Sequence, residues 1–491
     1  MQTIKYKKVL FIRATLHIAY VGAAGPPVGI AYLVEALKKY EVKCKTIDTT
    51  LGYDFDQICH DVQLFNPDVI GISMLTYGYL DTYKMIRGIK EKCPDIPIIA
   101  GGAHVSTLRE DVLRSCGAVD LGFVRESEES IVEFCQGRDP SQIKGVLYRE
   151  NGKVIYTGDR EYIGDLDTLD WPKDYGIDLN RYLSKEILIL TSRGCPYACI
   201  YCPISLAIGK KLRTRSAENV VDEVEYWYRL GYRRFSIFDD NFTFYKDRTI
   251  EICDEIKTRE LNNIYLRCGN GIRADRVDRE VLGKMREVGF VHVGYGVESG
   301  SDRVLKTLKK GETIEEIEKA IRISIELGFD VTLFFVVGAP GETLDDIEES
   351  IRVSLKYPVV ESRFYNLIPY PGTELFQWVQ DNNCFIKNPE EYLNDTRTFP
   401  SVPVFETPEL PYETRVKITK RLDAVTKKVR KKAILGKSKA FGLIGILAYY
   451  LFGDIYVSNL FQTLMRQNKI IRRVIDSVYL RIRKKNDVQL V

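Results

Sequence analysis

The residues with the clearest capacity for chemistry are three cysteines on one short stretch of the chain. Cys195, Cys199 and Cys202 are separated by three and then two residues, within TSRGCPYACIYCP (191–203). Three thiolates on one loop can bind three corners of a cubane iron–sulfur cluster, which normally takes four ligands. No fourth cysteine lies nearby, since the next one is Cys253. One iron would then be open to a substrate or a cofactor.

Two plainer interpretations apply to the same cysteines. One is a three-cysteine zinc site, but structural zinc takes four closed ligands, and no neighbouring histidine or cysteine completes the set. The other is three buried cysteines that act only as small apolar side chains. The other eight cysteines are scattered along the chain. The tight grouping of three therefore favours the cluster.

The elements around the cysteines predict a partial barrel. From Glu186 onward, strand-like apolar runs alternate with amphipathic stretches, several of which end with the glycine that caps a helix. The expected strands are residues 186–192, 233–239, 264–269, 290–297, 329–338 and 362–368. Six such units are fewer than the eight of a closed barrel. We therefore expect an open (β/α)6, TIM-like barrel with the cysteine loop at the carboxyl end of its first strand.

The cysteine spacing, with aromatic Tyr201 before the last cysteine, resembles the signature loop of the radical S-adenosylmethionine (SAM) enzymes. Later segments match that family in order: FDDNFTF (238–244), GYGVESGSDRVLK (294–306), VVGAPGET (336–343) and YPGTELF (370–376). The resemblance implies a [4Fe–4S] cluster whose open iron binds the amino and carboxylate groups of SAM. One-electron reduction then cleaves SAM to a 5′-deoxyadenosyl radical, which abstracts a substrate hydrogen.

The resemblance also implies which side chains contact SAM. They are Tyr201 in the cysteine loop, Asp239, Asp240 and Asn241 after the second barrel strand, Arg273 after the third, and Glu298 and Ser299 after the fourth. Structural alternatives stay open: a solvated turn at 239–241, a helix cap at Ser299 or Ser301, and a surface ion pair at Arg273. Cys268, on the third strand, is expected to be a packing residue.

The first part of the chain predicts a second parallel sheet. Between Lys8 and Gly137, short apolar runs alternate with amphipathic stretches, as in a Rossmann-like or flavodoxin-like unit. The segments GPPVGIAYLVEAL (25–37), PDVIGISMLT (67–76) and PIIAGGAHVS (97–106) resemble the cobalamin-binding domain of class B radical SAM enzymes. Ser73 and Leu75 match the S-x-L element of that domain, and Gly101 and Gly102 match its paired glycines. The resemblance implies that these four residues contact cobalamin.

Parts of this domain depart from the family pattern. The D-x-H-x-x-G element that supplies an axial histidine in other cobalamin proteins is missing, and His17 lies in the corresponding loop without matching neighbours. We therefore expect cobalamin without a histidine ligand; a degenerate domain that has lost cobalamin is the alternative. The segment VRESEES (124–130), at an expected interdomain contact, has Arg125 and Ser127 in place of two family glycines. His104 is expected to form a hydrogen bond in its loop and is assigned no metal.

Charge is distributed unevenly along the chain. Apolar residues make up 45% and charged residues 28% of the 491 residues, which excludes wholesale disorder. Residues 411–491 contain 19 lysines and arginines against 5 acidic residues, a balance of +14, so the first 410 residues carry −11 of the net charge of +3. The basic tail predicts contact with phospholipid headgroups, with a solvated helical cap over the barrel as the alternative. Nucleic acid is not expected, because no stacking aromatics interleave with the basic clusters.

The tail also contains an apolar run. Residues 441–452 (FGLIGILAYYLF) are uninterrupted by polar side chains. A run of 10–14 residues is more typical of a core or interfacial segment than of a membrane span, which takes roughly 20. Eleven sparse cysteines and the absence of a secretory pattern at the start predict a cytoplasmic protein with a peripheral membrane contact through the tail.

These observations predict four parts of the chain. They are a cobalamin-binding Rossmann-like domain at 1–140, a linker at 141–185 with a hairpin at Asn151–Gly152, a radical SAM barrel at 186–385, and a basic, partly apolar helical region at 386–491.

The expected function is that of a cobalamin-dependent radical SAM methyltransferase acting on an unactivated carbon of a small-molecule, lipid or isoprenoid substrate. As the resemblance implies, one SAM methylates cobalamin and a second yields the radical, with electrons from a flavodoxin- or ferredoxin-type reductase. The alternative is a cyclase, a C–C coupling enzyme or an oxidative ring-forming enzyme of the same architecture. A third interpretation, a binding module in which the cysteines hold a structural metal, would not be an enzyme.

Overall fold

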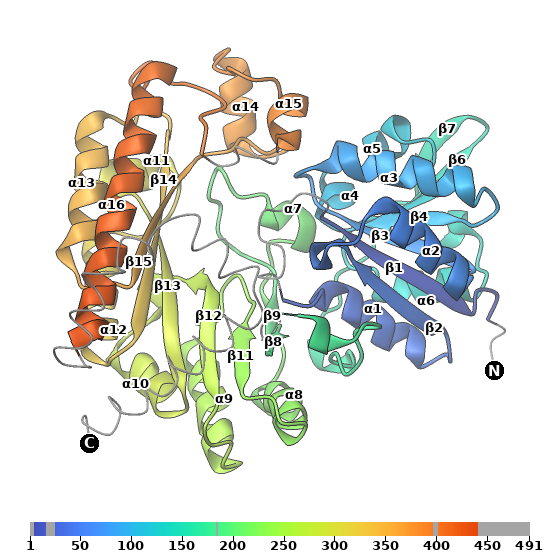
Figure 1. Cartoon of the computed structure of the whole chain (residues 1–491), viewed down its shortest axis with the longest axis horizontal. Helices are drawn as coiled ribbons and strands as arrows, with labels where there is room; N and C mark the ends of the chain where they lie inside the picture. Colours follow the sequence, from blue (N-terminus) through green and yellow to red (C-terminus); the bar gives the residue numbers. More distant parts are fainter. Residues whose placement is uncertain (1–3, 16–24, 183–184, 396–400, 440–491) are drawn as a thin grey trace.

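The protein is built around two parallel β-sheets, each flanked by helices. The computed structural model describes residues 4–15, 25–182, 185–395 and 401–439. The N-terminal sheet lies to the right in Figure 1 and the second sheet to the left, with the cysteine-containing segment between them. The predicted α/β class, with a Rossmann-like domain followed by a partial barrel and helices, is confirmed.

The first sheet has seven strands in the order β2-β1-β3-β4-β5-β6-β7. Their bounds are β1 (Lys8–Ala14), β2 (Lys43–Asp48), β3 (Val69–Met74), β4 (Ile98–Gly101), β5 (Leu121–Phe123), β6 (Val146–Glu150) and β7 (Lys153–Tyr156). Strands β1 to β5 are parallel and follow the 2-1-3-4-5 order of flavodoxin-like folds. In that order the crevice for a ligand lies where β1 and β3 end.

Helices cover both faces of this sheet. They are α1 (Val28–Lys38), α2 (Phe55–Phe65), α3 (Tyr79–Lys92), α4 (Ala103–Leu108), α5 (Glu110–Ser115) and α6 (Glu128–Cys135), with short 3-10 turns η1 (Thr49–Leu51) and η2 (Pro140–Gln142). Both faces of β1 are buried: Leu10 and Ile12 pack into one core, and Val9 and Phe11 into another. Two-sided burial explains why the strands read as continuous apolar runs in the sequence.

The predicted hairpin exists, but it belongs to the first sheet. Strands β6 and β7 pair antiparallel with each other, and β6 pairs antiparallel with β5. Asn151 and Gly152 both have positive φ, 50° and 74°, as a two-residue hairpin turn requires. Part of the stretch expected to be a linker therefore extends the N-terminal sheet. The short turns η3 (Leu166–Thr168) and η4 (Leu179–Arg181) follow the hairpin.

The second sheet contains six parallel strands in the sequential order β8-β11-β12-β13-β14-β15. Their bounds are β8 (Glu186–Ile189), β11 (Arg234–Ile237), β12 (Tyr265–Ile272), β13 (Phe290–Glu298), β14 (Asp330–Val337) and β15 (Glu361–Asn366). Each coincides with one of the six predicted strands. The open barrel is therefore confirmed.

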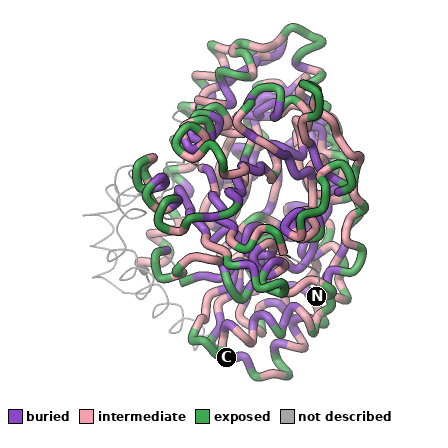
Figure 2. The backbone as a smooth tube through the Cα atoms, turned by 90° about the vertical axis from the view of Figure 1, so that its right-hand side faces the viewer, coloured by how far each residue is buried: buried purple, intermediate pink, exposed green. Residues whose placement is uncertain are grey.

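Helices cover the outer face of this barrel. They are α8 (Ala217–Arg229), α9 (Lys246–Thr258), α10 (Arg279–Glu287), α11 (Asp302–Thr307), α12 (Ile314–Glu326) and α13 (Leu344–Lys356), with the turn η5 (Ala274–Arg276). Alternate strand residues pack under these helices, among them Val293, Tyr295 and Cys268. Cys268 is thus the packing residue that we expected. Figure 2 shows the buried residues gathered in the interior of the tube and exposed residues at its outer turns.

The described part of the chain after the barrel forms three helices joined by loops. It forms α14 (Glu374–Asp381), α15 (Pro389–Asn394) and the long α16 (Tyr412–Lys439), which packs against β15 and α13. No helix within the described ranges is both long and apolar enough to cross a membrane. The apolar run 441–452 and His17 lie outside the described residues.

Candidate active site

The three cysteines lie on a loop that is held at its base by a small β-ladder. Strand β9 (Ser192–Arg193) follows β8, and β10 (Arg213–Thr214) pairs with it antiparallel, so the loop leaves and returns at one place. Gly194 begins the loop with a φ of 98°, and a Cβ there would lie 2.2 Å from the backbone oxygen of Lys211. Only glycine fits this position.

The loop is anchored on two further sides. The Cys195 N–H donates to the Gly209 carbonyl at 3.1 Å, just beyond helix α7 (Ile204–Ile208), and the Ile200 N–H donates to the Leu308 carbonyl at 3.2 Å. The loop is thus fixed to the end of α11 as well as to its own helix. Such anchoring orders the thiols before any cofactor arrives.

All three cysteines are half-buried, and none of them forms a disulfide. Burial raises the pKa of the Cys202 thiol to about 12 in the protein alone. Within the described residues, no three Cys, His, Asp or Glu side chains converge as ligands of a single ion would. A zinc site needs such convergence, whereas a cubane takes its thiolates at separate corners.

Of the three polar residues after β11, two lie beside the cysteines and one does not. The Asn241 side-chain amide donates a hydrogen bond to the Cys195 sulfur at 3.0 Å. Asp240 is half-buried beside Cys195 and Cys202, and burial, with the neighbouring Asp239 carboxylate, raises its pKa to about 6. Asn241 and Asp240 therefore belong to the thiol site, and the solvated-turn alternative does not describe them.

Asp239 has a different position. Its Oδ1 accepts from the Thr191 N–H at 2.6 Å, and its Oδ2 accepts from the hydroxyls of Thr191 and Ser192. These contacts join the end of β11 to the chain leaving β8. Asp239 therefore stabilises the base of the cysteine loop, and its expected contact with SAM stays a prediction.

On the other side of the thiols lies a buried ion-pair network. The Glu298 carboxylate pairs with the Lys310 ammonium at 3.1 Å, and Lys310 also lies 3.3 Å from Glu312. Tyr201 is next to Glu298, and its burial together with this carboxylate holds the pKa of the phenol well above its usual value. Glu298 itself has a φ of 63°, an unusual conformation for a residue other than glycine. Strain of this kind is concentrated at functional sites.

Arg273 is part of the same network. Its Nε donates to Asp275 at 2.8 Å, its Nη1 to the Lys310 carbonyl at 2.7 Å and its Nη2 to the Gly311 carbonyl at 3.1 Å. The guanidinium carbon also lies 3.6 Å from the centre of the Tyr197 ring. Arg273 is buried, so the surface-ion-pair alternative is wrong. Its contacts hold the loop after α11 against β12.

Ser299 is fully buried at the end of β13. Its hydroxyl accepts from the Ser301 N–H at 3.2 Å. Neither Ser299 nor Ser301 caps α11 through its side chain, so the helix-cap alternative is not borne out. A Cβ on Gly300 would lie 2.4 Å from the backbone of Glu349 in α13. The turn that carries Glu298 and Ser299 is therefore fixed by close backbone packing.

The residues expected to contact cobalamin meet at the carboxyl edge of the first sheet. Ser73 on β3 is opposite Gly101 on β4. Gly102 has a φ of 94°, and a Cβ there would lie 2.7 Å from the Met74 carbonyl, so the position excludes side chains. Leu75 is 42% exposed. An exposed leucine beside side-chain-free backbone suits a large, partly apolar ligand.

This edge faces the cysteine loop. Helix α4, which follows Gly102, contacts α7, which follows the last cysteine, and the two lie side by side in Figure 1. A second bridge joins α15 to α3: the Gly78 N–H donates to the Leu393 carbonyl at 2.7 Å, and the Leu80 N–H to Asn394 at 2.8 Å. The two candidate sites therefore open toward each other.

Comparison with known proteins supports this arrangement. Residues 189–353 match the radical SAM superfamily model and residues 14–134 match the B12 binding domain model. The uncharacterized methyltransferase PH0819 of Pyrococcus horikoshii is 30% identical over 376 residues, which cover 74% of this chain and 81% of that protein. The chain belongs to the class B radical SAM enzymes.

Two other comparisons are informative. The anaerobic magnesium-protoporphyrin IX monomethyl ester cyclase of Rubrivivax gelatinosus is 27% identical over 398 residues, covering 76% of this chain and 70% of that protein. The radical SAM methyltransferase TsrM from Kitasatospora setae has the same fold, with a TM-score of 0.72 at 18% identity, over 88% of this chain and 95% of that one. The cofactors of this class B radical SAM enzyme are the [4Fe–4S] cluster, SAM and cobalamin.

The residues present fit these cofactors. Three accessible thiols with one amide donor suit a cluster, because hydrogen bonds to the sulfur atoms stabilise its negative charge. The side-chain-free edge at Gly101 and Gly102 suits the nucleotide tail of cobalamin. We expect Cys195, Cys199 and Cys202 to hold the cluster.

A buried group of four charges joins the two domains of this radical SAM enzyme. Glu126, from the segment VRESEES, lies 3.1 Å from Arg193 and 2.7 Å from Arg213, and Glu128 lies 2.7 Å from Arg193. All four side chains are at most 10% exposed. Although burial opposes it, the Arg213 and Arg193 guanidiniums hold the pKa of Glu126 below its usual value. The expected interdomain contact is present, despite the two substituted glycines.

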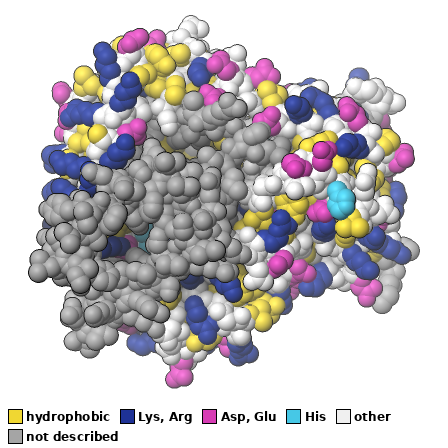
Figure 3. Space-filling model, viewed as in Figure 1, with side chains coloured by type: hydrophobic (Ala, Val, Ile, Leu, Met, Phe, Trp, Pro, Cys, Tyr) yellow, Lys and Arg dark blue, Asp and Glu magenta, His cyan; other side chains and the backbone are white. Residues whose placement is uncertain are grey.

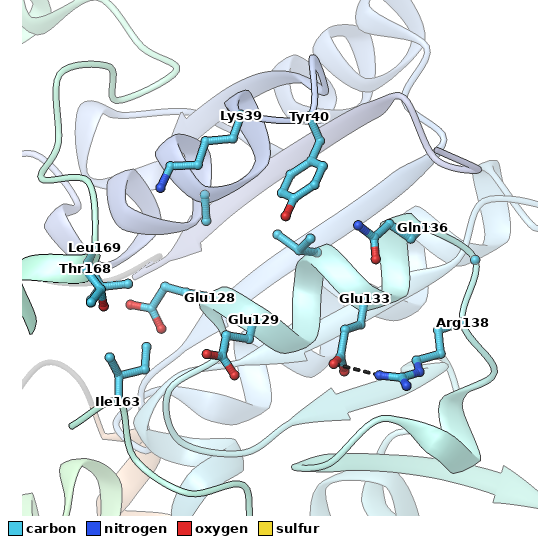
Figure 4. A pocket seen from close by; sticks show the side chains of 13 residues that line it. Lys39, Tyr40, Glu128, Glu129, Glu133, Gln136, Arg138, Ile163, Thr168 and Leu169 are labelled. Carbon is cyan, nitrogen blue, oxygen red and sulfur yellow. Dashed lines mark hydrogen bonds and ion pairs between the residues drawn. The ribbon is translucent and has the colours of Figure 1, made fainter. Parts of the chain in front are cut away.

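These arginines are the residues of the β9–β10 ladder, so the glutamates of the cobalamin domain neutralise the base of the cysteine loop. Figure 4 shows Glu128 at the wall of a surface groove of about 850 Å³ between α1, α6 and residues 163–169. Glu129 and Glu133 line the same groove, where Glu133 pairs with Arg138. Of the four charged residues, Glu128 alone lines the groove.

His104 was expected from the sequence to form a hydrogen bond, whereas three charged residues near the site were not expected. His104 is buried on α4, and its Nε2 shares a hydrogen bond of 2.9 Å with the Tyr83 hydroxyl on α3, so a hydrogen bond exists but its partner is on a neighbouring helix and not in the loop. Lys310, Glu312 and Glu126 were not singled out by sequence. Glu126 lies in a segment marked by its family match, but nothing in LKKGET indicates that Lys310 pairs with both Glu312 and the distant Glu298.

Proposed function

We propose that this enzyme methylates an unactivated carbon of its substrate. The contact between α7, next to the thiols, and α4, next to the cobalamin edge, carries the proposal. When bound, the cluster and SAM supply hydrogen abstraction, and cobalamin supplies the methyl group. A substrate held between them has one C–H carbon within reach of both.

The chain's own residues perform supporting tasks. The network of Lys310, Glu298 and Glu312 holds fixed charges beside Cys199, where the polar end of SAM would bind. Asn241 donates toward the cluster sulfur at Cys195. The helices α14 and α15 lie at the barrel mouth, and α15 contacts α3, which restricts entry of water.

The substrate that we propose is a lipid or isoprenoid. The basic tail with an apolar run at 441–452 supports it, since such a sequence suits an enzyme working at a lipid surface. Electrons would come from a one-electron donor of the flavodoxin or ferredoxin type, because both SAM cleavage and regeneration of the methyl carrier need them.

The test is anaerobic turnover with isotopically methyl-labelled SAM, reductant and a lipid extract. Replacement of C–H by C–CH3 consumes two SAM, so the methyltransferase yields S-adenosylhomocysteine and 5′-deoxyadenosine in equal amounts with a labelled, methylated product. Labelled product in a water-soluble fraction would remove the lipid assignment but keep methyl transfer.

Similarity to the Rubrivivax cyclase favours one alternative, a ring-forming enzyme without methylation. It would yield 5′-deoxyadenosine without S-adenosylhomocysteine and a product that carries no label. Such a result would overturn the proposed methyl transfer. It would leave the radical SAM assignment intact.

A further inference from the structure

Helix α16 carries a row of exposed lysines. Lys417, Lys420, Lys427, Lys428 and Lys432 are exposed, and no described residue forms an ion pair with any of them. We call these five residues the lysine face. The whole helix has eleven basic residues against two acidic ones, a balance of +9. In Figure 3, Lys and Arg side chains gather at the upper left, over α16.

The lysine face lies away from the packed side of the helix. The buried residues of α16 are Arg415, Ile418, Leu422, Val425 and Val429. At about 100° per residue they occupy an arc of roughly 80°, whereas the lysine face occupies a separate arc of roughly 140° and runs for about 22 Å. One side of α16 therefore completes the fold, and the fold leaves the other side with concentrated positive charge.

Unscreened like charges along one helix oppose each other, so this arrangement is not explained by stability. Other basic residues of α16 do have partners: Arg421 pairs with Glu348, and Arg430 with Glu361. The five lysines of the lysine face differ from these arginines because none of them has such a carboxylate among the described residues.

The location of the lysine face favours a membrane over a redox partner. Helix α16 packs on β15, whereas the cysteine loop follows β8, and these strands are at opposite edges of the six-stranded sheet. An electron donor must approach the cluster, so this face is badly placed for it. Tyr412 is the helix's single aromatic residue, which gives little platform for stacking nucleic-acid bases.

We propose that the lysine face binds an anionic phospholipid surface. The chain that follows α16 continues within two residues into the apolar run 441–452. Polybasic and apolar signals next to each other are the combination that gives stable peripheral binding, since one signal alone binds weakly. This docking surface determines where the enzyme works and is independent of the reaction proposed above.

The test uses the full-length chain and vesicles of phosphatidylcholine with or without phosphatidylglycerol, with binding measured by co-sedimentation. We expect binding to the anionic vesicles that weakens with added salt. Changing Lys420, Lys427, Lys428 and Lys432 to glutamine should reduce partitioning at least about tenfold, because each cation near such a surface contributes roughly fivefold. Charge reversal to glutamate should abolish salt-sensitive binding.

The matched control changes four exposed lysines elsewhere, Lys43, Lys84, Lys153 and Lys319, to glutamine. It keeps the same net charge as the first variant, and its binding should equal that of the wild type. Equal loss in both variants, or equal binding to neutral vesicles, would overturn the lysine face as the docking surface. So would preferential binding to duplex DNA over vesicles at the same salt.

A second readout separates this proposal from the proposed function. Reductive SAM cleavage to 5′-deoxyadenosine, measured without vesicles, should be the same in both variants and the wild type, which also shows that they fold. Loss of vesicle binding with retained formation of 5′-deoxyadenosine would support the lysine face. Retained vesicle binding in the glutamate variant would refute it whatever the product.

Discussion

At the scale of single residues, the amide of Asn241 is the clearest control on the cysteine site. It donates at 3.0 Å to the sulfur of Cys195, and such bonds stabilise the more negative, reduced state of a cluster. We predict that Asn241→Leu lowers the cluster's reduction potential. If the hydrogen bond is about 1.4 kcal/mol stronger in the reduced cluster than in the oxidised cluster, its loss lowers the one-electron potential by about 59 mV.

A redox titration followed by electron paramagnetic resonance measures this shift. Asn262→Leu, at an exposed position after α9, is the control and should leave the potential unchanged. An unaltered potential in Asn241→Leu with full iron content would show that the amide does not act on the cluster.

His104 makes the stability of the cobalamin domain depend on pH. Burial lowers the pKa of its imidazole from about 6.5 to about 4. The unfolded chain therefore takes up a proton at a higher pH than the folded protein, so stability falls as the pH drops below about 6.5. From pH 7 to pH 5 this single group should cost about 2 kcal/mol.

Denaturant unfolding of the wild type and of His104→Gln at both pH values measures the effect. Glutamine does not titrate, so the variant should lose less stability between pH 7 and pH 5, even if the loss of stacking on Tyr79 lowers its stability at pH 7. Parallel losses in the two proteins would refute the assignment to His104.

At the scale of elements, the β9–β10 ladder depends on charges from the other domain. Removing one partner of a buried ion pair leaves an uncompensated charge and commonly costs about 3–5 kcal/mol. We predict that Glu126→Gln destabilises the enzyme by about 3 kcal/mol at pH 7 and reduces the iron bound after reconstitution. Glu129→Gln, whose side chain is 59% exposed, should have little effect on either.

The pH dependence supplies a second check on the same variant. Because the folded pKa of Glu126 is lowered, its stabilising contribution is present above the unfolded value and is lost as the pH falls through the folded one. The difference between wild type and Glu126→Gln should therefore shrink in acid. A difference that stays constant down to about pH 3 would contradict the ion-pair explanation.

Helix α16 is locked to the barrel by a buried arginine. Arg415 is fully buried, and its Nη2 donates to the Val337 carbonyl at 3.0 Å and to Asn366 at 3.1 Å. A Cβ on Gly338 would lie 2.2 Å from the same Nη2. Gly338→Ala should therefore displace the arginine and lower the unfolding free energy by several kcal/mol, roughly the range of other severe packing defects.

Gly283→Ala is the matched substitution for a thermal unfolding comparison. Gly283 lies inside α10, and no neighbouring atom would lie within 4 Å of a Cβ added there, so alanine should stabilise by about 0.5–1 kcal/mol. A Gly338→Ala protein as stable as the wild type would show that Arg415 has room to move.

Local sequence patterns predicted the elements well and their long-range contacts poorly. All six barrel strands and helices such as α2, at Phe55–Phe65, follow from periodicity and capping residues. Strand β5 has only three residues, too few to show a period, and the hairpin's membership of the first sheet depends on pairing between distant segments. Neither strand β5 nor the position of the hairpin in the sheet can be predicted from a short stretch of sequence.

The same limit applies to the site. The cysteines and Asn241 lie in short motifs, so their role is visible in sequence. Lys310 reaches both Glu298 and Glu312 only because the loop after α11 folds back toward the end of β13. Asp239 was assigned by its motif, and only the structure shows that Thr191 and Ser192 occupy both of its oxygens.

At the scale of the whole molecule, cobalamin should stabilise the protein through mass action. A ligand at about one hundred times its dissociation constant adds about 2.7 kcal/mol to a folded state that alone binds it. At Gly101 a Cβ meets nothing closer than 3.7 Å, so Gly101→Val should keep the apo fold while filling the crevice. We predict that this variant loses most of the thermal stabilisation by hydroxocobalamin.

Gly117→Val, in open space away from the crevice, should retain the full ligand-dependent shift. If the wild type shows no shift with hydroxocobalamin, the N-terminal domain does not bind it under these conditions, and the methyl-transfer proposal loses its donor. If Gly101→Val keeps the shift, the crevice lies elsewhere on that domain.

The buried charges of Glu126, Glu128, Arg193 and Arg213 also determine whether the two domains can be exchanged separately, in evolution or by engineering. The N-terminal domain supplies two buried carboxylates and the barrel supplies two buried guanidiniums, and each pair is neutralised only by the other. A barrel separated from its N-terminal domain would expose Arg193 and Arg213, which are buried and neutralised in the whole protein. The contact between the two domains therefore resembles a protein interior more than an exchangeable interdomain interface.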